Sequence, residues 1–316
     1  MSIAAIILAA GKSTRMKSQR VKVLHEICGR SMLAYVLDAA RAAGAQRIVV
    51  VVGHDRESVM REFAEQKDII WVHQQEQKGT GHAVQVCREA MRGFSGDIFV
   101  LAGDGPLIRA QTLERILREH REQRAAMTLA TSVIDNPAGY GRIVRDAAGQ
   151  ILAIVEEKDA TSEERNIHEV NPSYYLFDSQ SLFATLERIK PNNQKGEYYL
   201  TDALAILRGQ SQRVTALAAV PSEDVLSINS RQELALVSAV MQRRIQLAVM
   251  ESGVTIVSPM NTWIEFGAKI GQDTVLEPFT WVGAGAQIAP GSHVSAGMVI
   301  GRGGEFPAPG RTDVNA

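Results

Sequence analysis

The sequence has few cysteines, almost no net charge and no long hydrophobic run. It contains only two cysteines, Cys28 and Cys87, which excludes a disulfide scaffold and a four-cysteine metal site and favours a reducing compartment. A formal net charge of −1 gives no general attraction to nucleic acid or to an anionic membrane. The apolar runs fall short of the ~20 residues of a membrane span, and the N-terminal run is too short for a signal peptide. We therefore expect a cytoplasmic protein that binds neither nucleic acid nor a membrane.

The aliphatic residues that are present cluster in short runs separated by helical patterns. Residues 3–8 and 47–53 are apolar without alternation, which is typical of strands buried on both faces. Between them, residues 31–43 carry a helical apolar stripe that Ser31 can cap and Gly44 can end. The succession of strand, helix and strand predicts an α/β fold with a mostly parallel, Rossmann-like sheet. Further strands are expected at residues 69–73, 97–101, 127–133 and 170–177, with a hairpin over residues 142–156 inserted beside the main sheet.

The first expected strand ends in a loop suited to phosphate. Residues 9–11 are small enough for a ligand to lie against the backbone, and Arg15 and Lys22 add two cations. The loop is not a Walker A motif, because Ile6 stands where that motif requires a glycine five positions before Gly11. It also lacks the later glycines of the dinucleotide-binding fingerprint. An ordinary turn between a strand and a helix remains the alternative.

Polar residues follow two later strands. Gln74 and Gln77 are candidate contacts to a base or ribose, because an amide offers both a donor and an acceptor; a polar surface loop is the alternative. Asp104 follows a central strand, where open α/β sheets bind ligands. A carboxylate opposite a cationic phosphate loop suggests Mg²⁺. Alternatively, Asp104 only caps the turn before Pro106.

The C-terminal part contains a hexapeptide repeat, which predicts a short left-handed parallel β-helix of a little over two coils. Such arrays usually need about three or more units, so we expect support from neighbouring chains in a homotrimer. The repeat consists of Ile264, Ile270, Leu276, Val282, Ile288, Val294 and Ile300. The expected organisation is an α/β domain over residues 1–228, a linking helix over 229–250, the β-helix over 251–302 and a loose tail over 303–316.

Several motifs occur together in one order, and their combination is specific. They are residues 8–16 (LAAGKSTRM), 22–25, 74–82, 103–107, 139–142, 156–159 and 196–199, and Asn229. Over about residues 3–250 the chain closely resembles the bacterial N-acetylglucosamine-1-phosphate uridylyltransferases, the N-terminal half of the bifunctional enzyme that makes UDP-N-acetylglucosamine.

The resemblance implies a nucleotidyltransferase domain that converts UTP and N-acetylglucosamine 1-phosphate into UDP-N-acetylglucosamine and pyrophosphate with Mg²⁺. It implies that nucleotide binds at Leu8, Ala9, Ala10, Gly11, Gln74, Gly79, Thr80 and Gly103. It implies that Arg15 and Lys22 act on the phosphates, and that Asp104 and Asn229 bind the metal. The implied sugar contacts are Gly141, Glu156, Asn171, Tyr199 and Thr201. Because the repeat stops early, we expect no acetyl transfer.

The sequence departs from the family pattern at a few positions. Val21 replaces a proline before the lysine, and Gly105 replaces an aliphatic residue after the metal-binding aspartate. Pro172 and Ser173 replace Thr-Gly after the asparagine, which leaves the sugar open. One alternative is therefore a related enzyme that uses another sugar or NTP. A second is a non-catalytic sugar-nucleotide sensor, which would not need all of the implied phosphate and metal ligands.

Overall fold

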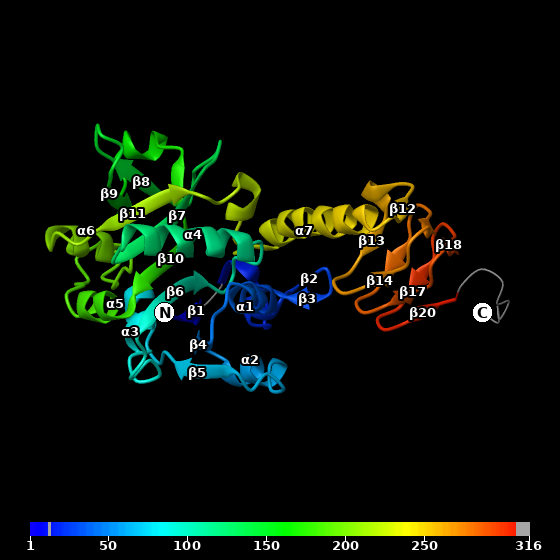
Figure 1. Ribbon diagram of the computed structural model, residues 1–316, viewed down its shortest axis with the longest axis horizontal. Helices are drawn as coiled ribbons and strands as arrows, with labels where there is room; N and C mark the ends of the chain where they lie inside the picture. Colours follow the sequence, from blue (N-terminus) through cyan, green and yellow to red (C-terminus); the bar gives the residue numbers. More distant parts are fainter. Residues whose placement is uncertain (12–13, 308–316) are drawn as a thin grey trace. The chain divides into compact units, whose positions relative to one another are not determined.

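The computed structural model describes residues 1–11 and 14–307 (Figure 1). The chain divides into two compact units. The first, here called the α/β unit, contains residues 1–24 and 32–229. The second, here called the β-helix unit, contains residues 25–31 and the chain from residue 230 onward. The chain therefore passes from one unit to the other at three points.

A single mixed sheet forms the centre of the α/β unit. Its strands follow the order β11-β7-β10-β6-β1-β4-β5, and β10 runs antiparallel to both of its neighbours while the other pairs along this path are parallel. The hairpin of β8 (Gly141–Arg145) and β9 (Ile151–Val155) joins the start of β10. This arrangement confirms the predicted fold class. The main strands are β1 (Ser2–Ala9), β4 (Arg47–Val52), β5 (Ile69–His73), β6 (Gly96–Ala102), β7 (Met127–Val133), β10 (Glu169–Asp178) and β11 (Val214–Ala218).

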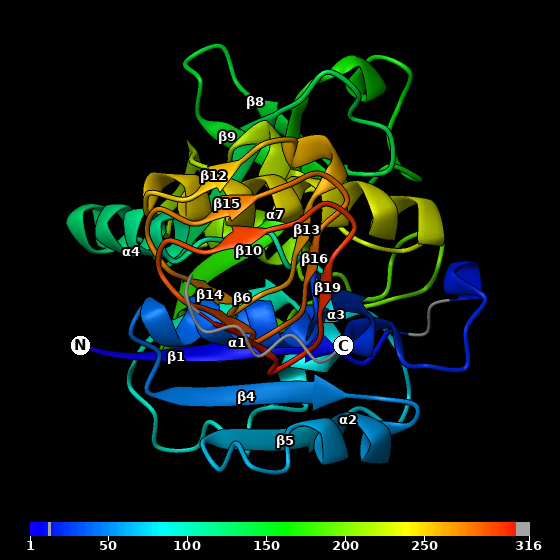
Figure 2. The same cartoon turned by 90° about the vertical axis from the view of Figure 1, so that its right-hand side faces the viewer.

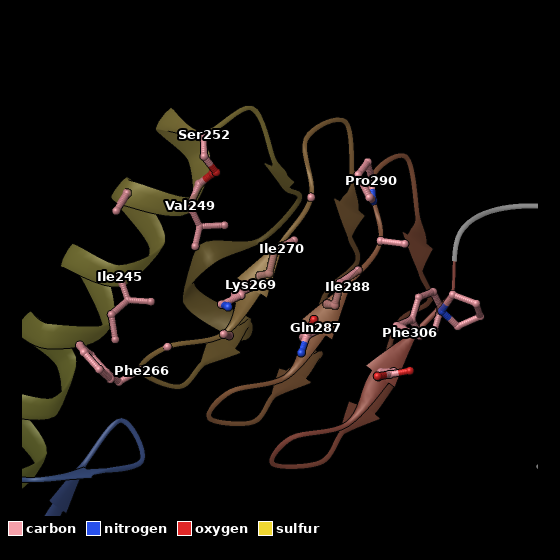
Figure 3. A pocket seen from close by; sticks show the side chains of 17 residues that line it. Ile245, Val249, Ser252, Phe266, Lys269, Ile270, Gln287, Ile288, Pro290 and Phe306 are labelled. Atoms are coloured by element: carbon pink, nitrogen blue, oxygen red, sulfur yellow. The ribbon is translucent and has the colours of Figure 1, made fainter.

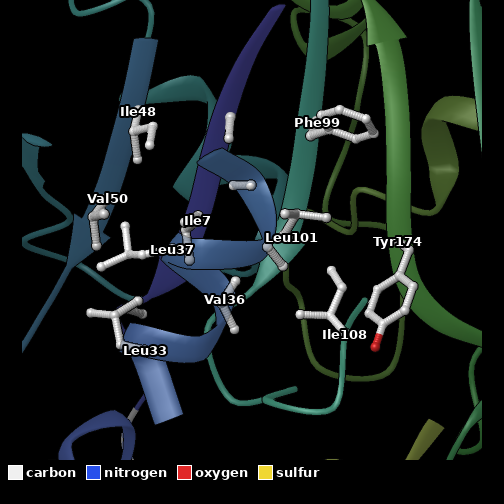
Figure 4. Packing of buried hydrophobic residues seen from close by; sticks show 14 of the residues in the cluster. Ile7, Leu33, Val36, Leu37, Ile48, Val50, Phe99, Leu101, Ile108 and Tyr174 are labelled. Carbon is white, nitrogen blue, oxygen red and sulfur yellow. The ribbon is translucent and has the colours of Figure 1, made fainter. Parts of the chain in front are cut away.

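Helices cover both faces of this sheet. On one face, Leu33 and Leu37 of α1 pack against Ile7, Val50 and Leu101 from three adjacent strands (Figure 4). On the other face, apolar residues of α3, α5 and α6 form a second core. Burial of both faces explains why the strand sequences are apolar without alternation. The helices of the unit are α1 (Met32–Ala42), α2 (Arg56–Glu62), α3 (Thr80–Gln85), α4 (Ala110–Gln123), α5 (Ser179–Leu186) and α6 (Asp202–Gly209).

The chain order places a topological switch point between β1 and β6. From β1 the chain builds β4 and β5 on one side (Figure 2), and then returns to place β6 on the other side of β1. Ligands of open α/β sheets bind outside the carboxyl ends of the strands at such a point. Because β10 is antiparallel to β6, its beginning lies at this same edge. The ends of β1 and β6 and the start of β10 therefore share one edge.

The β-helix unit contains nine described two-residue strands in three parallel columns, β12-β15-β18, β13-β16-β19 and β14-β17-β20 (Figure 2). The seven repeat aliphatics occupy the second position of their strands and point into the coil, as predicted for a left-handed β-helix. The strands are β12 (Thr255–Ile256), β13 (Trp263–Ile264), β14 (Lys269–Ile270), β15 (Val275–Leu276), β16 (Trp281–Val282), β17 (Gln287–Ile288), β18 (His293–Val294), β19 (Val299–Ile300) and β20 (Glu305–Phe306).

The repeat extends further than its sequence pattern indicated. Strand β12 precedes the first expected aliphatic, and β20 pairs with β17 inside the segment expected to be a loose tail. The described strands thus complete three coils rather than a little over two. The rest of the expected tail, residues 308–316, lies outside the described residues.

Helix α7 (Arg231–Glu251) closes the first coil of the β-helix with two buried glutamines. Gln242 donates to the carbonyl oxygen of Ile264 (2.7 Å) and accepts from its backbone nitrogen (2.8 Å). Gln246 donates to the carbonyl oxygens of Thr262 (2.7 Å) and Pro259 (2.8 Å). The amide of Gln242 therefore bonds to β13 as a neighbouring strand would, which protects an exposed sheet edge. In the part of the chain that is described, no helix combines the length and hydrophobicity needed to cross a membrane.

We expect Gln242→Leu to lower the free energy of unfolding of the β-helix unit by about 2–4 kcal/mol, because two hydrogen bonds are lost and buried backbone groups of Ile264 remain unpaired. Chemical denaturation, with hydrogen exchange of residues 255–264, measures the effect. Gln232→Leu is the matched control, since Gln232 is exposed on the same helix. Equal stability of the two variants would contradict this role for Gln242.

Candidate active site

A cavity of about 480 Å³ lies at the switch-point edge of the α/β unit. The ends of β1 and β6, the loop after β5 and the segment 195–201 line it. Its walls thus come from segments that are far apart in the sequence. The predicted site residues that line it are Leu8, Ala9, Ala10, Gly11, Lys22, Gln74, Gly79, Thr80, Asp104, Glu156, Tyr199 and Thr201.

Close backbone packing shapes the floor of the cavity at the end of β1. The backbone nitrogen of Gly103 donates to the carbonyl oxygen of Leu8 (2.9 Å), and a Cβ at Gly103 would lie 3.0 Å from that oxygen. Gly103 therefore allows the ends of β6 and β1 to approach closely, and it does not line the cavity. Gln77 lines the cavity and donates to the carbonyl oxygen of Ala10 (2.5 Å). The side chain of Gln77 thus fixes Ala10, at the beginning of the predicted phosphate loop.

The loop from Gln74 to Thr80 is tied to the segment after α5. Gly79 has a φ of +102°, and a Cβ there would lie 2.6 Å from the carbonyl oxygen of Tyr198, so only glycine fits. The hydroxyl of Thr80 accepts from the backbone nitrogen of Leu200 (3.0 Å). The buried side chain of Gln74 donates to the carbonyl oxygen of Gly79 (3.2 Å). The loop that carries the predicted base contacts is therefore fixed against the backbone of residues 198–200.

Lys22, Asp104 and Asn229 meet around one ammonium group. Lys22 is the first residue of a 3₁₀ turn (Lys22–Leu24), and the other two residues of this turn are buried. Its Nζ donates to Oδ2 of Asp104 and to Oδ1 of Asn229, the latter at 3.1 Å. The backbone nitrogen of Ile228 donates to the carbonyl oxygen of Asp104 (3.2 Å), which places Asn229 beside it. Two oxygen ligands that are distant in sequence therefore converge on a single cation.

Carboxylates gather around Thr201 and Tyr199, which also line the cavity. Glu156 accepts a hydrogen bond from the hydroxyl of Thr201 (3.4 Å). Burial raises the pKa of Glu156, and Asp159 and Asp202 add to this effect, whereas the Thr201 bond and Lys195 oppose it. Burial and nearby carboxylates also raise the pKa of Tyr199 to about 12, so its hydroxyl stays protonated. This part of the lining offers acceptors and donors suited to hydroxyl groups.

A bulge in β10 shapes another part of the cavity wall. The pairing register shifts between Val170 and Tyr174, and Ser173 has a φ of +66°. Asn171 is buried, accepts from the backbone nitrogen of Ser173 (3.1 Å) and donates to the hydroxyl of Tyr175 (2.5 Å). Ser173 and Tyr175 line the cavity, and Asn171 lies behind them. Asn171 therefore does not line the cavity itself but bonds to two residues that do.

Three other predicted residues lie off the cavity lining: Arg15, Gly141 and Asn229, of which Asn229 bonds to the lining residue Lys22. Gly141 pairs with Asn171, and a Cβ on it would lie 3.2 Å from Ile154 and 3.7 Å from Oε2 of Glu156. Its small size thus allows Glu156 to approach the strand. Arg15 is exposed on a short turn (Thr14–Met16) and does not line the cavity. Residues 12–13 of the phosphate loop lie outside the described residues.

Sequence reasoning missed several residues of the lining, above all Lys195, Glu197 and Tyr175, whereas Ser173 was noted as a departure from the family pattern. Lys195 and Glu197 flank Gly196 in a polar loop, and a charged residue on each side of that motif was the available signal. Tyr175 belongs to a strand sequence, in which nothing distinguishes cavity residues from packing residues.

A second cavity, of about 1200 Å³, lies within the β-helix unit (Figure 3). Helix α7 forms one side with Ile245 and Val249, and the column β14-β17-β20 forms the other with Ile270, Ile288 and Phe306. Its larger volume does not make it the better candidate, because most of the residues that line it are apolar. The cavity of the α/β unit instead gathers an ammonium, carboxylates and amides.

The chain is similar to known proteins over most of its length. The model of the MobA-like NTP transferase domain matches residues 5–193. The chain is 42% identical over 298 residues to the Bifunctional protein GlmU of Geotalea daltonii and 43% identical over 299 residues to that of Pelobacter propionicus, covering 94% and 95% of this chain and 65% of each relative. It is 44% identical over 303 residues to the same-named protein of Listeria welshimeri, covering 94% of this chain and 66% of the relative.

The chain thus spans about 65% of the length of these curated relatives. A crystal structure of UDP-glucose pyrophosphorylase complexed with UDP-glucose has a similar fold, with a TM-score of 0.63, 18% identity, and coverage of 77% of this chain and all of that one. The family model covers more than half of the chain, including the strands that end at the cavity. The chain therefore belongs to the MobA-like NTP transferase domain family.

Proposed function

We propose that the protein transfers a uridylyl group from UTP to N-acetylglucosamine 1-phosphate and releases pyrophosphate. The observation that carries the proposal is the convergence of Asp104 and Asn229 on the ammonium of Lys22 at the sheet edge. The relatives named Bifunctional protein GlmU support the choice of reaction. We place the reaction in the cytoplasm, in keeping with two buried free cysteines, Cys28 and Cys87.

The proposed pose follows the two ends of the cavity. The backbone of residues 8–11 and the amide of Gln74 bind the nucleoside, because they offer donors and acceptors beside a small-residue floor. Gly79 and Thr80 complete the wall on that side. Glu156 and Tyr199 bind sugar hydroxyls at the other end. The reacting phosphates then lie between them, next to Lys22.

The chemistry requires no general base. The phosphate of a sugar 1-phosphate has a second pKa of about 6, so it is mostly a dianion near neutral pH. One of its oxygens attacks the α-phosphorus of UTP, the bond from that phosphorus to the bridging oxygen breaks, and pyrophosphate leaves with the electron pair. The contribution of Lys22, with Arg15 at the mouth of the loop, is to position the phosphates and neutralise charge at the α-phosphate.

Asp104 and Asn229 fit a divalent cation, which we infer to be Mg²⁺. A carboxylate and an amide oxygen are ligands that Mg²⁺ accepts together with water and substrate phosphates. Both oxygens already bond to one cationic nitrogen, so they lie close enough to share an ion. The ion would supply charge neutralisation at the phosphate oxygens. Lys22 would then be released from these two oxygens to contact phosphate.

A related enzyme for another sugar is the second candidate. It is favoured by Ser173, which lines the cavity in a left-handed conformation, φ +66°, at a position where the family pattern has glycine. A hydroxymethyl group there changes the wall beside Glu156. Pyrophosphate release from a panel of sugar phosphates and NTPs, with and without Mg²⁺, distinguishes the candidates. Binding of UDP-sugar without turnover would favour a sensor instead.

We also propose a homotrimer assembled through the β-helix. Trp263 and Trp281 stack on consecutive rungs of one column, with ring centroids 5.5 Å apart. Trp281 is 42% exposed and Val299, on the next rung, is 71% exposed. A strip of exposed apolar residues on a regular face favours association with other chains.

We expect Lys22→Ala and Asp104→Ala each to lower turnover by about 100-fold or more, the scale of losing one electrostatic stabiliser of a transition state. Steady-state pyrophosphate release measures the effect, with circular dichroism to confirm folding. Lys67→Ala is the control, because Lys67 is an exposed lysine on the surface of the same unit. Turnover within about threefold of wild type would remove these residues from the mechanism.

We expect Glu156→Gln to raise thermal stability at pH 7–8 while weakening sugar phosphate binding. The raised pKa of Glu156 means that its ionised form is disfavoured in the folded state, so its cost to stability is absent below the ordinary pKa and grows as pH rises through the folded-state pKa. The advantage of the glutamine should therefore vanish in acid. A stability difference independent of pH would contradict this assignment.

We expect Trp281→Glu to shift the protein from trimer to monomer, because a carboxylate would have to be buried at the contact. Light scattering after size-exclusion chromatography measures the mass. Gln287→Glu, at an exposed position of another column, should leave the trimer intact. A wild-type monomer, or a trimeric Trp281→Glu variant, would exclude this interface.

A further inference from the structure

The chain passes between the two units immediately beside the proposed catalytic cation and the proposed metal ligand. Residues 25–31 belong to the β-helix unit, and they begin three positions after Lys22. Ser230, which also belongs to that unit, directly follows Asn229. The backbone that follows Lys22 and the backbone that follows Asn229 therefore both continue into the β-helix unit.

The segment after Lys22 is a hairpin of β2 (Glu26–Ile27) and β3 (Arg30–Ser31). Its turn carries positive φ values, +48° at Cys28 and +79° at Gly29. The carbonyl oxygen of Cys28 accepts from the backbone nitrogen of Phe266 (2.7 Å), and the Arg30 guanidinium lies 4.3 Å from the centroid of that ring. The hairpin is thus built into the β-helix unit, although it lies in the N-terminal part of the chain.

An arginine of the third coil, Arg302, also bonds to this hairpin. Arg302 donates from Nη2 to Oε2 of Glu26 (2.5 Å) and from Nε to Oε2 of Glu265 (3.0 Å). Glu265 is buried and also accepts from the backbone nitrogen of Ala284 (3.0 Å). A Cβ at Gly29 would lie 2.7 Å from Oε2 of Glu265, so the turn is in close contact with this carboxylate. One guanidinium therefore links two coils to the strand that follows Lys22.

The segment after Asn229 is tied to the same hairpin. Arg231, the first residue of α7, lies with Nη1 3.3 Å from Nδ1 of His25. His25 is buried and immediately precedes β2. The chain beyond Lys22 and the chain beyond Asn229 are therefore fastened to one another within the β-helix unit.

We propose that Arg302 is a positioning residue for nucleotidyl transfer, acting through Glu26 on the backbone that carries Lys22. This inference rests on the proposed function. Arg302 touches no substrate in this scheme; it fixes the hairpin, and the hairpin fixes one end of the short turn from which the Lys22 side chain extends. Small displacements of a catalytic group are costly, about 100-fold for 1 Å. The third coil of the β-helix thus contributes to the reaction of the other unit.

The test is the kinetics of Arg302→Ala in the full chain. We expect kcat to fall by about fivefold or more while KM for UTP changes by less than about twofold, because alignment at the transition state is lost rather than ground-state binding. Arg302→Lys, which keeps one donor and the charge, should recover part of kcat, and Glu26→Gln should behave like Arg302→Ala. Glu277→Gln, which removes the partner of His293 on another column, should retain wild-type kinetics.

A double variant separates positioning from general destabilisation. If Arg302 acts through Lys22, Arg302→Ala should not lower the residual rate of Lys22→Ala any further. Additive losses, or a kcat of Arg302→Ala close to wild type, would overturn the inference.

Hydrogen exchange of residues 22–27 gives a readout that needs no catalysis. These amides should exchange faster in Arg302→Ala and in Glu26→Gln than in wild type. Unchanged exchange overturns the positioning role even if the protein proves to be active. Inactivity of the wild-type protein with UTP and every sugar phosphate, by contrast, counts against the proposed function alone.

Discussion

The bonds from the ammonium of Lys22 to Asp104 and Asn229 are the interaction on which the proposed site depends. The side chains of Lys22 and Asp104 are only 11% and 22% exposed, so their attraction is stronger than that of a surface pair. Leaving this carboxylate without a cation would be costly. Lys22 can therefore move to a phosphate only if another cation takes its place. In the proposed reaction, the nucleotide should therefore bind together with a divalent cation, so that metal binding and substrate binding are coupled.

The main sheet could be predicted from the sequence because its strands are buried on both faces and read as continuous aliphatic runs. The β-helix could be predicted because Ile264 and its successors recur at a fixed period. The membership of residues 25–31 in the β-helix unit was not predictable, since it depends on contacts such as Arg302 with Glu26, 276 positions apart. Strand β20 was missed for a similar reason: a Gly- and Pro-rich composition indicates a loop, but pairing with β17 orders Glu305 and Phe306.

The candidate site was predictable where a residue type carries its own chemistry. Lys22 was expected near a ligand because it adds a cation to the small-residue loop, and Asp104 because it follows a central strand; both line the cavity. The glycines were harder to interpret. Gly103 and Gly141 provide space for the approach of neighbouring groups and do not face the cavity. Tyr175 had no local signal that separated it from ordinary strand residues, and Lys195 had only its place beside Gly196 in a polar loop.

The proposed phosphate and sugar contacts are in opposite electrostatic states. Where Lys22 meets Asp104 and Asn229, the protein's own groups bond to one another, so a phosphate that binds Lys22 would replace existing bonds. At the proposed sugar contact, Glu156 is half-buried, its pKa is raised and its hydrogen bond to Thr201 is long, so a ligand that donates hydroxyl groups would relieve an existing cost. In the proposed pose, sugar hydroxyls would bind Glu156 with a gain in free energy. Phosphate would bind Lys22 favourably only if a cation replaced Lys22 beside Asp104 and Asn229. A site of this kind selects a ligand that carries both groups at the correct separation, which is the property that a sugar nucleotide has and that a free sugar or a free phosphate lacks.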